Sequence, residues 1–133
     1  MAVVYRSYYM FSHIMVGANN VTKSKRFYDA IMKTLGYEEG VIDDSGRCFY
    51  FSPESIFCIT KPIDGEVATY GNGMTIGFKA NSPEQVNAWH NAGTDNGGTT
   101  CENPPGIRDN GKSKYLAYLR DPDGNKLCAV YFM

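Results

Sequence analysis

Residues 121–127 read DPDGNKL and form a strong turn signal. Aspartate, proline, glycine and asparagine favour a tight turn, because proline fixes its own φ and glycine accepts positive φ without steric cost. Strand-like runs stand on both sides of this turn, at 113–120 and 126–132. The sequence therefore predicts that the chain closes with an antiparallel β-hairpin.

An amphipathic helix is predicted near the start of the chain. Asn20 is a suitable N-terminal cap for it. Its apolar stripe consists of Phe27, Ile31 and Leu35 at helical spacing. Gly36 follows as a C-terminal stop signal. We therefore expect a helix from about residue 20 to about residue 35.

A second helix is predicted to begin at residues 82–85, which read SPEQ. Serine caps such a helix, proline suits the first helical position, and glutamine at the third completes a capping box. The buried side is expected to carry Val86, Trp89 and Gly93, and the helix to end near the glycines at 97 and 98.

Each predicted helix follows one strand-like run and precedes three further segments. The expected segments are 11–17, 37–43, 47–52 and 56–61, then 74–80, a loose segment near 99–103, 113–120 and 126–132. A shift of 62 positions aligns Ile14 with Ile76, and a shift of 70 aligns Cys58 with Cys128. The sequence therefore indicates two related modules, at about 10–61 and 73–133, joined by a linker at 62–72.

One helix can cover only one face of such a sheet, so the other face needs a partner. Two modules can close their open faces around a shared cup, which suits a small molecule. We therefore expect a single domain over residues 1–133. Its class is α+β, with two βαβββ modules forming a cup-shaped mixed sheet with the helices outside.

Composition excludes several classes of function. Lys plus Arg is 13 and Asp plus Glu is 14 in 133 residues, so the net charge of −1 argues against a general nucleic-acid binder. No apolar run is long enough to span a membrane, and residues 1–10 lack the core of a secretory signal. The four cysteines form no C-x-x-C pair, so we expect reduced thiols in the cytoplasm.

Several motifs resemble the glyoxalase/bleomycin-resistance/extradiol-dioxygenase superfamily, also called the vicinal oxygen chelate fold. They are SHIMV at 12–16, SKRFYD at 24–29, LGY at 35–37, TIGF at 75–78 and DPDGNKL at 121–127. The resemblance covers roughly residues 10 to 133 and implies paired βαβββ modules, a cup-shaped site and often a homodimer. Enzymes of this family usually hold a divalent metal through one ligand from each of four strands.

The four ligand positions that the resemblance implies fall on His13, Cys58, Thr75 and Cys128. Only His13 matches the usual ligand type, so the metal site is expected to be degenerate. One imidazole, two thiols and one hydroxyl do not suit iron, manganese or magnesium. Glyoxalase chemistry also needs a carboxylate where Cys128 stands, so neither that activity nor dioxygenase activity is expected.

Three alternatives for these residues remain open. In the first, these residues line a metal-free pocket, in which cysteine acts as a small apolar residue. In the second, a zinc site with an open fourth position, as in some zinc enzymes, is formed by His13, Cys58 and Cys128. In the third, His13 serves as a base and Tyr118 is its partner in acid–base chemistry, since alternation along its strand turns Tyr118 toward the same cup.

Residues 97–111 are rich in glycine and proline and are expected to form a mobile rim over the cup. Arg108 in this stretch is a candidate contact for an anionic group of the substrate. The substrate-binding candidates are thus His13, Cys58, Thr75, Arg108, Tyr118 and Cys128. Residues 1–9 are expected to add an edge strand or a dimer contact.

The leading hypothesis is a cytoplasmic homodimer that binds a small molecule in the cup without a cofactor, and that binds neither nucleic acid nor membrane. The second is a lyase- or isomerase-type enzyme, with zinc at the cysteine and histidine set or with His13 and Tyr118 as acid and base. The third is an interaction protein whose cup is filled by its own side chains.

Overall fold

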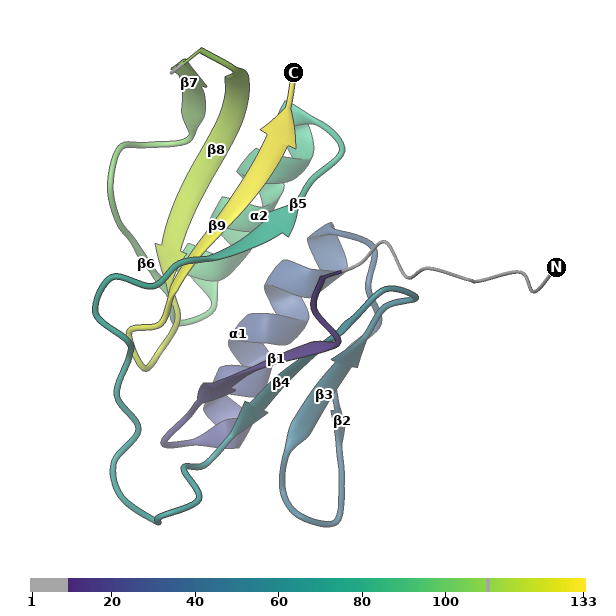
Figure 1. Ribbon diagram of the computed structural model, residues 1–133, viewed down its shortest axis with the longest axis vertical. Coiled ribbons are helices and arrows are strands. Elements are labelled where there is room, and N and C mark those ends of the chain that lie inside the picture. The colour runs from purple at the N-terminus through teal and green to yellow at the C-terminus, as the bar shows by residue number, and fades with distance from the viewer. Residues whose placement is uncertain (1–9, 110) are drawn as a thin grey trace, which may run out of the picture.

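The computed structural model describes residues 10–109 and 111–133, and its strands form two sheets with one helix each (Figure 1). The expectation for residues 1–9 lies outside the described residues. The first module contains β1 (His13–Gly17), α1 (Val21–Thr34), β2 (Val41–Ile42), β3 (Cys48–Phe51) and β4 (Ile56–Thr60). The second contains β5 (Ile76–Lys79), α2 (Pro83–Asp95), β6 (Thr99–Thr100), β7 (Gly106–Asp109), β8 (Ser113–Arg120) and β9 (Lys126–Phe132).

The two sheets share one topology. Sheet A has the order β1-β4-β3-β2, and sheet B has the order β5-β9-β8-β6, with β7 also paired to β8. In each sheet the first strand runs parallel to the last strand of its module, and the other pairs are antiparallel. The predicted α+β class and its two βαβββ-like modules are confirmed.

The caps and the hairpin lie where the sequence predicts them. The Asn20 side chain accepts a hydrogen bond from the Lys23 amide, and the Ser82 hydroxyl accepts one from the Gln85 amide. Gly36, at φ 92°, follows the end of α1. The predicted strands of the closing hairpin coincide with β8 and β9.

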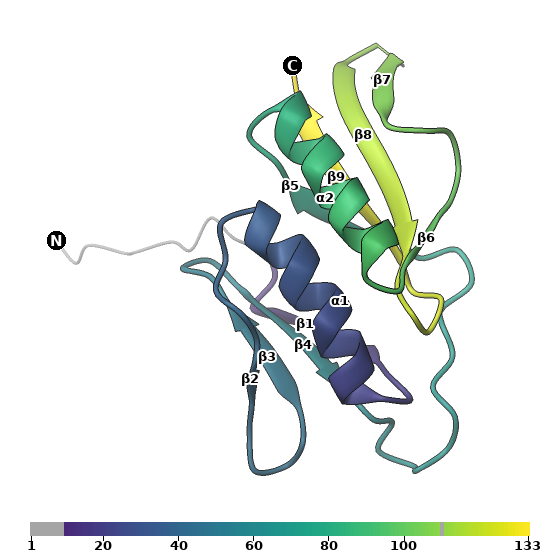
Figure 2. The same cartoon turned by 180° about the vertical axis from the view of Figure 1, so that it is seen from behind.

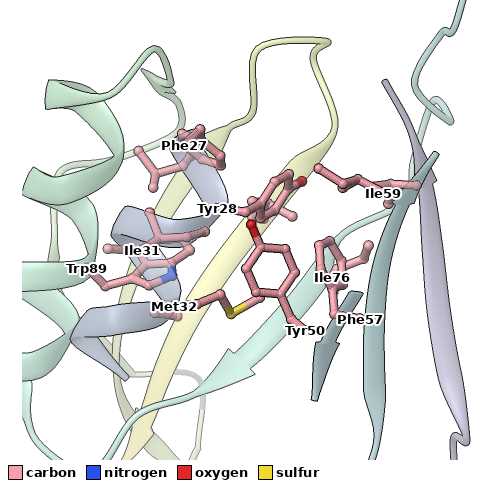
Figure 3. Close-up of a cluster of buried hydrophobic side chains, with 14 of the residues drawn as sticks. Phe27, Tyr28, Ile31, Met32, Tyr50, Phe57, Ile59, Ile76 and Trp89 are labelled. Carbon is pink, nitrogen blue, oxygen red and sulfur yellow. The ribbon is translucent and has the colours of Figure 1, made fainter. Parts of the chain in front are cut away.

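Both helices lie on the same side of the sheets. The sheets stand in front of the helices in Figure 1, and the helices stand in front in Figure 2. The buried face of α1 includes Phe27, Tyr28 and Ile31, and that of α2 carries Val86, Trp89 and Gly93, as predicted. The apolar side chains of these two faces belong to one core that spans both modules (Figure 3).

Polar contacts also join the modules. The Tyr28 hydroxyl donates to Asp121, and the Ser24 hydroxyl donates to Asp123, so the 121–125 turn docks on α1. Asn125 donates to the Gly17 carbonyl. At the other end of α1, the side-chain amide of Gln85 donates to the backbone carbonyl of Thr34 at 2.9 Å. Module two is thus attached at both ends of α1.

Two details differ from the sequence-based expectation. The strands form two sheets rather than one cup-shaped sheet, because the modules pack through α1 and α2 and an apolar groove lies between the edges of β1 and β5. In addition, part of the predicted mobile rim is strand β7, which pairs with β8. Proline and glycine around this strand hide its extended pattern in the sequence.

Candidate functional site

The side of each sheet that faces away from the helices is called its open face. Along β1, Val16 is buried in the core while His13 and Met15 are exposed, as alternation requires. Along β9, Leu127 and Ala129 are buried in the core, which places Lys126 and Cys128 on the open face. The candidate residues of both modules can be placed by this alternation.

Sheet A brings His13 and Cys58 to one open face. The register pairs His13 with Ile56 and Met15 with Cys58, so the two candidates lie on adjacent strands, two positions apart. His13 is exposed, and its Nδ1 is 2.7 Å from the Ser12 hydroxyl. Cys58 is only 1% exposed, and burial raises the pKa of its thiol.

Aromatic rings accompany these candidates on sheet A. Phe49 pairs directly with Cys58, and its ring stacks on that of Phe51 at 6.1 Å between centroids. Phe51 is 58% exposed although it is a large apolar side chain. A half-buried ring stacked on an exposed one is typical of a surface that binds a ligand or another chain.

Sheet B brings Thr75, Tyr118 and Cys128 to its open face. Cys128 pairs with Tyr118 on one side and with Gly77 on the other. Thr75 lies two positions before Gly77 and is exposed, on the same face by alternation. The Cys101 amide donates to the Tyr118 carbonyl, so Cys101, Tyr118 and Cys128 form a row across three neighbouring segments.

The ionisable groups of this row are held in their neutral forms. Burial raises the pKa values of the Cys128 and Cys101 thiols and of the Tyr118 phenol above their ordinary values. A thiol with a raised pKa is a weak nucleophile at neutral pH. The Tyr118 hydroxyl can therefore donate a hydrogen bond to a ligand, while the cysteines act as small apolar surface.

Lys126 and Glu102 add an ion pair beside this row. The Lys126 ammonium lies 5.2 Å from the centre of the Tyr118 ring, a cation–π contact. Glu102 holds it from the loop between β6 and β7, and their hydrogen bond raises the pKa of Lys126. Glu102 has φ 56°, a left-handed conformation that side chains rarely adopt.

Arg108, the predicted anion contact, lies at the rim of the same face. It pairs with Lys114 of β8 in the sheet register. Its guanidinium donates to the carbonyls of Asn103 and Pro104, at 3.0 and 2.9 Å. Arg108 therefore ties down the loop that carries Glu102, and no carboxylate neutralises it among the described contacts.

The predicted zinc set is divided between the two sheets. His13 and Cys58 lie on sheet A, whereas Cys128 lies on sheet B. Over residues 10–109 and 111–133, no three histidine, cysteine, aspartate or glutamate side chains are placed so that they could hold a metal ion. The residues of one chain therefore do not fit the zinc site. The proposed acid–base partners, His13 and Tyr118, are divided in the same way.

An apolar groove of about 330 Å³ runs between the two sheets. Its lining includes Phe11, Ile14 and Ile56 from one module and Ile76 and Phe78 from the other. Glu54 also lines it. The groove shows that the module junction leaves apolar surface uncovered at the adjoining strand edges.

Some residues of these faces escape the sequence analysis. Phe49 and Phe51 are recognisable only once β3 is paired with β4, although their alternation with Cys48 and Tyr50 is visible in the sequence. Lys126 follows the predicted turn, so its place on a strand is visible too. The contact with Glu102 depends on a loop conformation that no sequence pattern indicates.

Comparisons with known proteins agree with this architecture. Residues 10–129 match the profile of the Glyoxalase/Bleomycin resistance protein/Dioxygenase superfamily. The crystal structure of a glyoxalase/bleomycin resistance protein from Albidiferax ferrireducens is 61% identical to this chain, with a TM-score of 0.88. The match covers 91% of this chain and 98% of that one.

More distant structures share the fold. A glyoxalase/bleomycin resistance protein/dioxygenase family enzyme from Burkholderia phytofirmans is 14% identical, with a TM-score of 0.71, over 92% of this chain and 98% of that one. A lactoylglutathione lyase from Agrobacterium tumefaciens is 17% identical, with a TM-score of 0.63, over 90% and 91%. No curated protein matches the sequence. Neither helix in the described part of the chain is long and apolar enough to cross a membrane.

Proposed function

Because the chain belongs to the glyoxalase/bleomycin resistance/dioxygenase superfamily, we propose that it binds a small molecule, without a metal ion, in a cup enclosed by the open faces of its sheets. The observation that carries this proposal is the exposure of large apolar side chains on those faces. They are Met15, Val41, Phe51 and Phe132, between 42% and 59% exposed.

A second copy of the chain completes the cup in this proposal. In the described part of one chain, both open faces point away from the helices, and no helix covers them (Figure 1). In a two-fold dimer, sheet A of each copy lies opposite sheet B of the other. The same contact then occurs twice, and both open faces of each copy are covered. The homodimer that the family resemblance implies is therefore part of the proposal.

The chemistry of the faces favours binding over catalysis. The Tyr118 phenol and the open-face thiols are held neutral, so they offer shape, apolar surface and hydrogen bonds rather than a base or a nucleophile. The four cysteines carry free thiols, which supports the expected cytoplasmic location. One chain does not assemble the zinc set, and burial raises the pKa of the Cys58 and Cys128 thiols, whereas zinc binds thiolates, so metal-free binding is proposed in place of the zinc-dependent lyase.

Binding of aromatic probes and the mass of the protein in solution test this function. We expect sedimentation velocity to show a dimer, and calorimetry to show that 2-naphthoate or 2-naphthamide binds, both before and after treatment with EDTA. Phe51→Asp should weaken the dimer and the binding together, because it places a charge on the aromatic pair. Ile63→Asp, at a position 97% exposed outside both sheets, is the matched control.

Three results would contradict the proposal. A monomer that binds neither probe would exclude the shared cup. Binding that disappears with EDTA would show that a metal ion is required. Equal effects of Phe51→Asp and Ile63→Asp on binding would show that the binding surface does not include sheet A.

A further inference from the structure

Basic side chains gather on the open face of sheet B. Alternation and register place five of them there, from β5, β7, β8 and β9: Lys79, Arg108, Lys114, Arg120 and Lys126. The whole chain has a net charge of −1, so this concentration is local and is not a consequence of composition. Such a face attracts anions.

The strands supply no carboxylate to balance this charge. β1 to β4 of sheet A read HIMVG, VI, CFYF and IFCIT and contain no acidic residue. Among the described strands of sheet B the only acidic residue is Asp109, which pairs with Ser113 on the face that also carries Tyr115 and points toward α2. The strands of a second copy that covers sheet B therefore bring no carboxylate to these cations.

One carboxylate reaches the open face from outside the strands. Glu102 pairs with Lys126 beside the Tyr118 ring, and it does so from a left-handed backbone conformation at φ 56°. Strained conformations of this kind persist where the surroundings enforce them, often at ligand sites. Here the bonds from Arg108 to the carbonyls of Asn103 and Pro104 secure the loop.

We propose that the cup binds an aromatic or apolar molecule with a carboxylate group, and that this group replaces the Glu102 carboxylate on Lys126. The inference rests on the proposed function, since it assigns a ligand class to the same cup. Lys126 supplies the cation, and the Tyr118 hydroxyl lies on the same face of sheet B as a donor. In the proposed dimer, Phe49 and Phe51 on sheet A of the second copy face them and offer stacked rings to the apolar part. Glu102 occupies the anion position until the ligand arrives.

Two probes with one ring system separate charge from shape. 2-Naphthoate is ionised at pH 7.5, whereas 2-naphthamide is neutral and nearly the same size. We expect calorimetry to show naphthoate binding about tenfold more tightly, since a hydrogen bond to a charged group contributes at least that factor when water is excluded. Raising the salt concentration should reduce the difference.

Variants of the ion pair test the positions. Lys126→Gln should abolish the preference for naphthoate, and Lys126→Arg should keep it, because only the charge is required. Glu102→Gln should strengthen naphthoate binding by roughly threefold to tenfold, since the competing carboxylate is gone, and should leave naphthamide binding unchanged. Lys33→Gln and Glu38→Gln, both at exposed positions outside the sheets, are matched controls.

The possible failures are distinguishable. Equal affinity for the two probes would contradict the ligand class while the cup itself stands. Weaker naphthoate binding by Glu102→Gln would show that Glu102 supports the ligand instead of competing with it. Absence of binding by both probes would overturn the proposed function and this inference with it.

Discussion

The hydroxyl of Tyr28 in α1 donates a 2.5 Å hydrogen bond to Oδ2 of Asp121, which stands 93 residues further along the chain. Both residues are buried. Asp121 also accepts hydrogen bonds from the amides of Asp123 and Asn125, which shape the turn of the closing hairpin. One carboxylate therefore both forms the hairpin turn and joins module two to module one.

Tyr28→Phe should lower the free energy of unfolding by about 2 kcal/mol, because it leaves the buried Asp121 carboxylate with one partner fewer. Urea unfolding measures the change. Tyr115→Phe is the matched control, since its hydroxyl bonds the neutral side chain of Asn87 at a half-buried site, and it should lose about 1 kcal/mol or less. Equal losses of unfolding free energy in the two variants would show that the bond to the Asp121 carboxylate stabilises the fold no more than a bond to a neutral group.

Asp29→Asn should destabilise the protein in a manner that depends on pH. Burial raises the pKa of Asp29, but hydrogen bonds from Lys25, the Gly40 amide and Tyr50 outweigh it and lower the pKa below its ordinary 3.8. The folded chain keeps this carboxylate ionised to lower pH than the unfolded chain, so its stabilisation is present above 3.8 and disappears as pH falls through the folded-state pKa.

The expected loss for Asp29→Asn is about 1 kcal/mol at pH 7, since the ion pair is partly exposed to solvent. Urea unfolding of both proteins at several values between pH 7 and pH 3 gives the difference. Asp95→Asn, at the exposed end of α2, is the matched control. A constant difference for Asp29→Asn would contradict the role assigned to its charge.

Gly93→Ala should destabilise the core although alanine favours helices. A Cβ atom at Gly93 would overlap Leu119 and would also press on Phe27 and Ile31. Overpacking of a core costs about 1–3 kcal/mol, which exceeds the gain in helix propensity of about 1 kcal/mol. Thermal unfolding should show a lower midpoint, whereas Asn91→Ala at an exposed position of the same helix should change it little. A midpoint raised by Gly93→Ala would refute the close contact.

Alkylation should report the raised pKa values of the cysteines. Cys101 and Cys128 are half-buried, and burial raises both pKa values, so iodoacetamide should modify them slowly at pH 7 and faster as pH rises past 9. Cys48 is fully buried against the core and should react only after unfolding. Mass spectrometry of peptides gives the rates. A thiol that reacts equally fast at pH 6 and pH 9 would be an activated nucleophile instead.

Local features of the fold were predictable because local chemistry determines them. The caps at Asn20 and Ser82 depend on side chains that bond amides three residues away. The closing hairpin depends on the conformational preferences of residues 121–125. Strand β7 was missed, because it is extended only through its pairing with β8.

The arrangement of the modules depends on contacts that are distant in sequence. Period-two alternation correctly separates the open face, with His13 and Met15, from the core face with Val16. It does not tell how two such units pack. The close approach of Gly93 in α2 to Phe27 and Ile31 in α1 brings the two helices together. The bond from Tyr28 to Asp121 adds a polar contact between the modules.

For the candidate site, the sequence predicts which face of a sheet each residue occupies, but not what that residue does. His13 and Cys58 lie on one open face and Tyr118 and Cys128 on the other, as their strand positions require. Their roles toward a ligand stay predictions. The pairing of Glu102 with Lys126 was out of reach, since it depends on a left-handed residue in an irregular loop.

The attachment of module two at both ends of α1 limits how the molecule can deform. The Ser24 contact with Asp123 secures the start of the helix, and the Gln85 contact with Thr34 secures its end. A hinge at the module junction would have to break hydrogen bonds at both places at once. These bonds resist a change in the angle between the two sheets, so a ligand of the proposed cup would meet a largely preformed shape in which the loops are the parts that adjust.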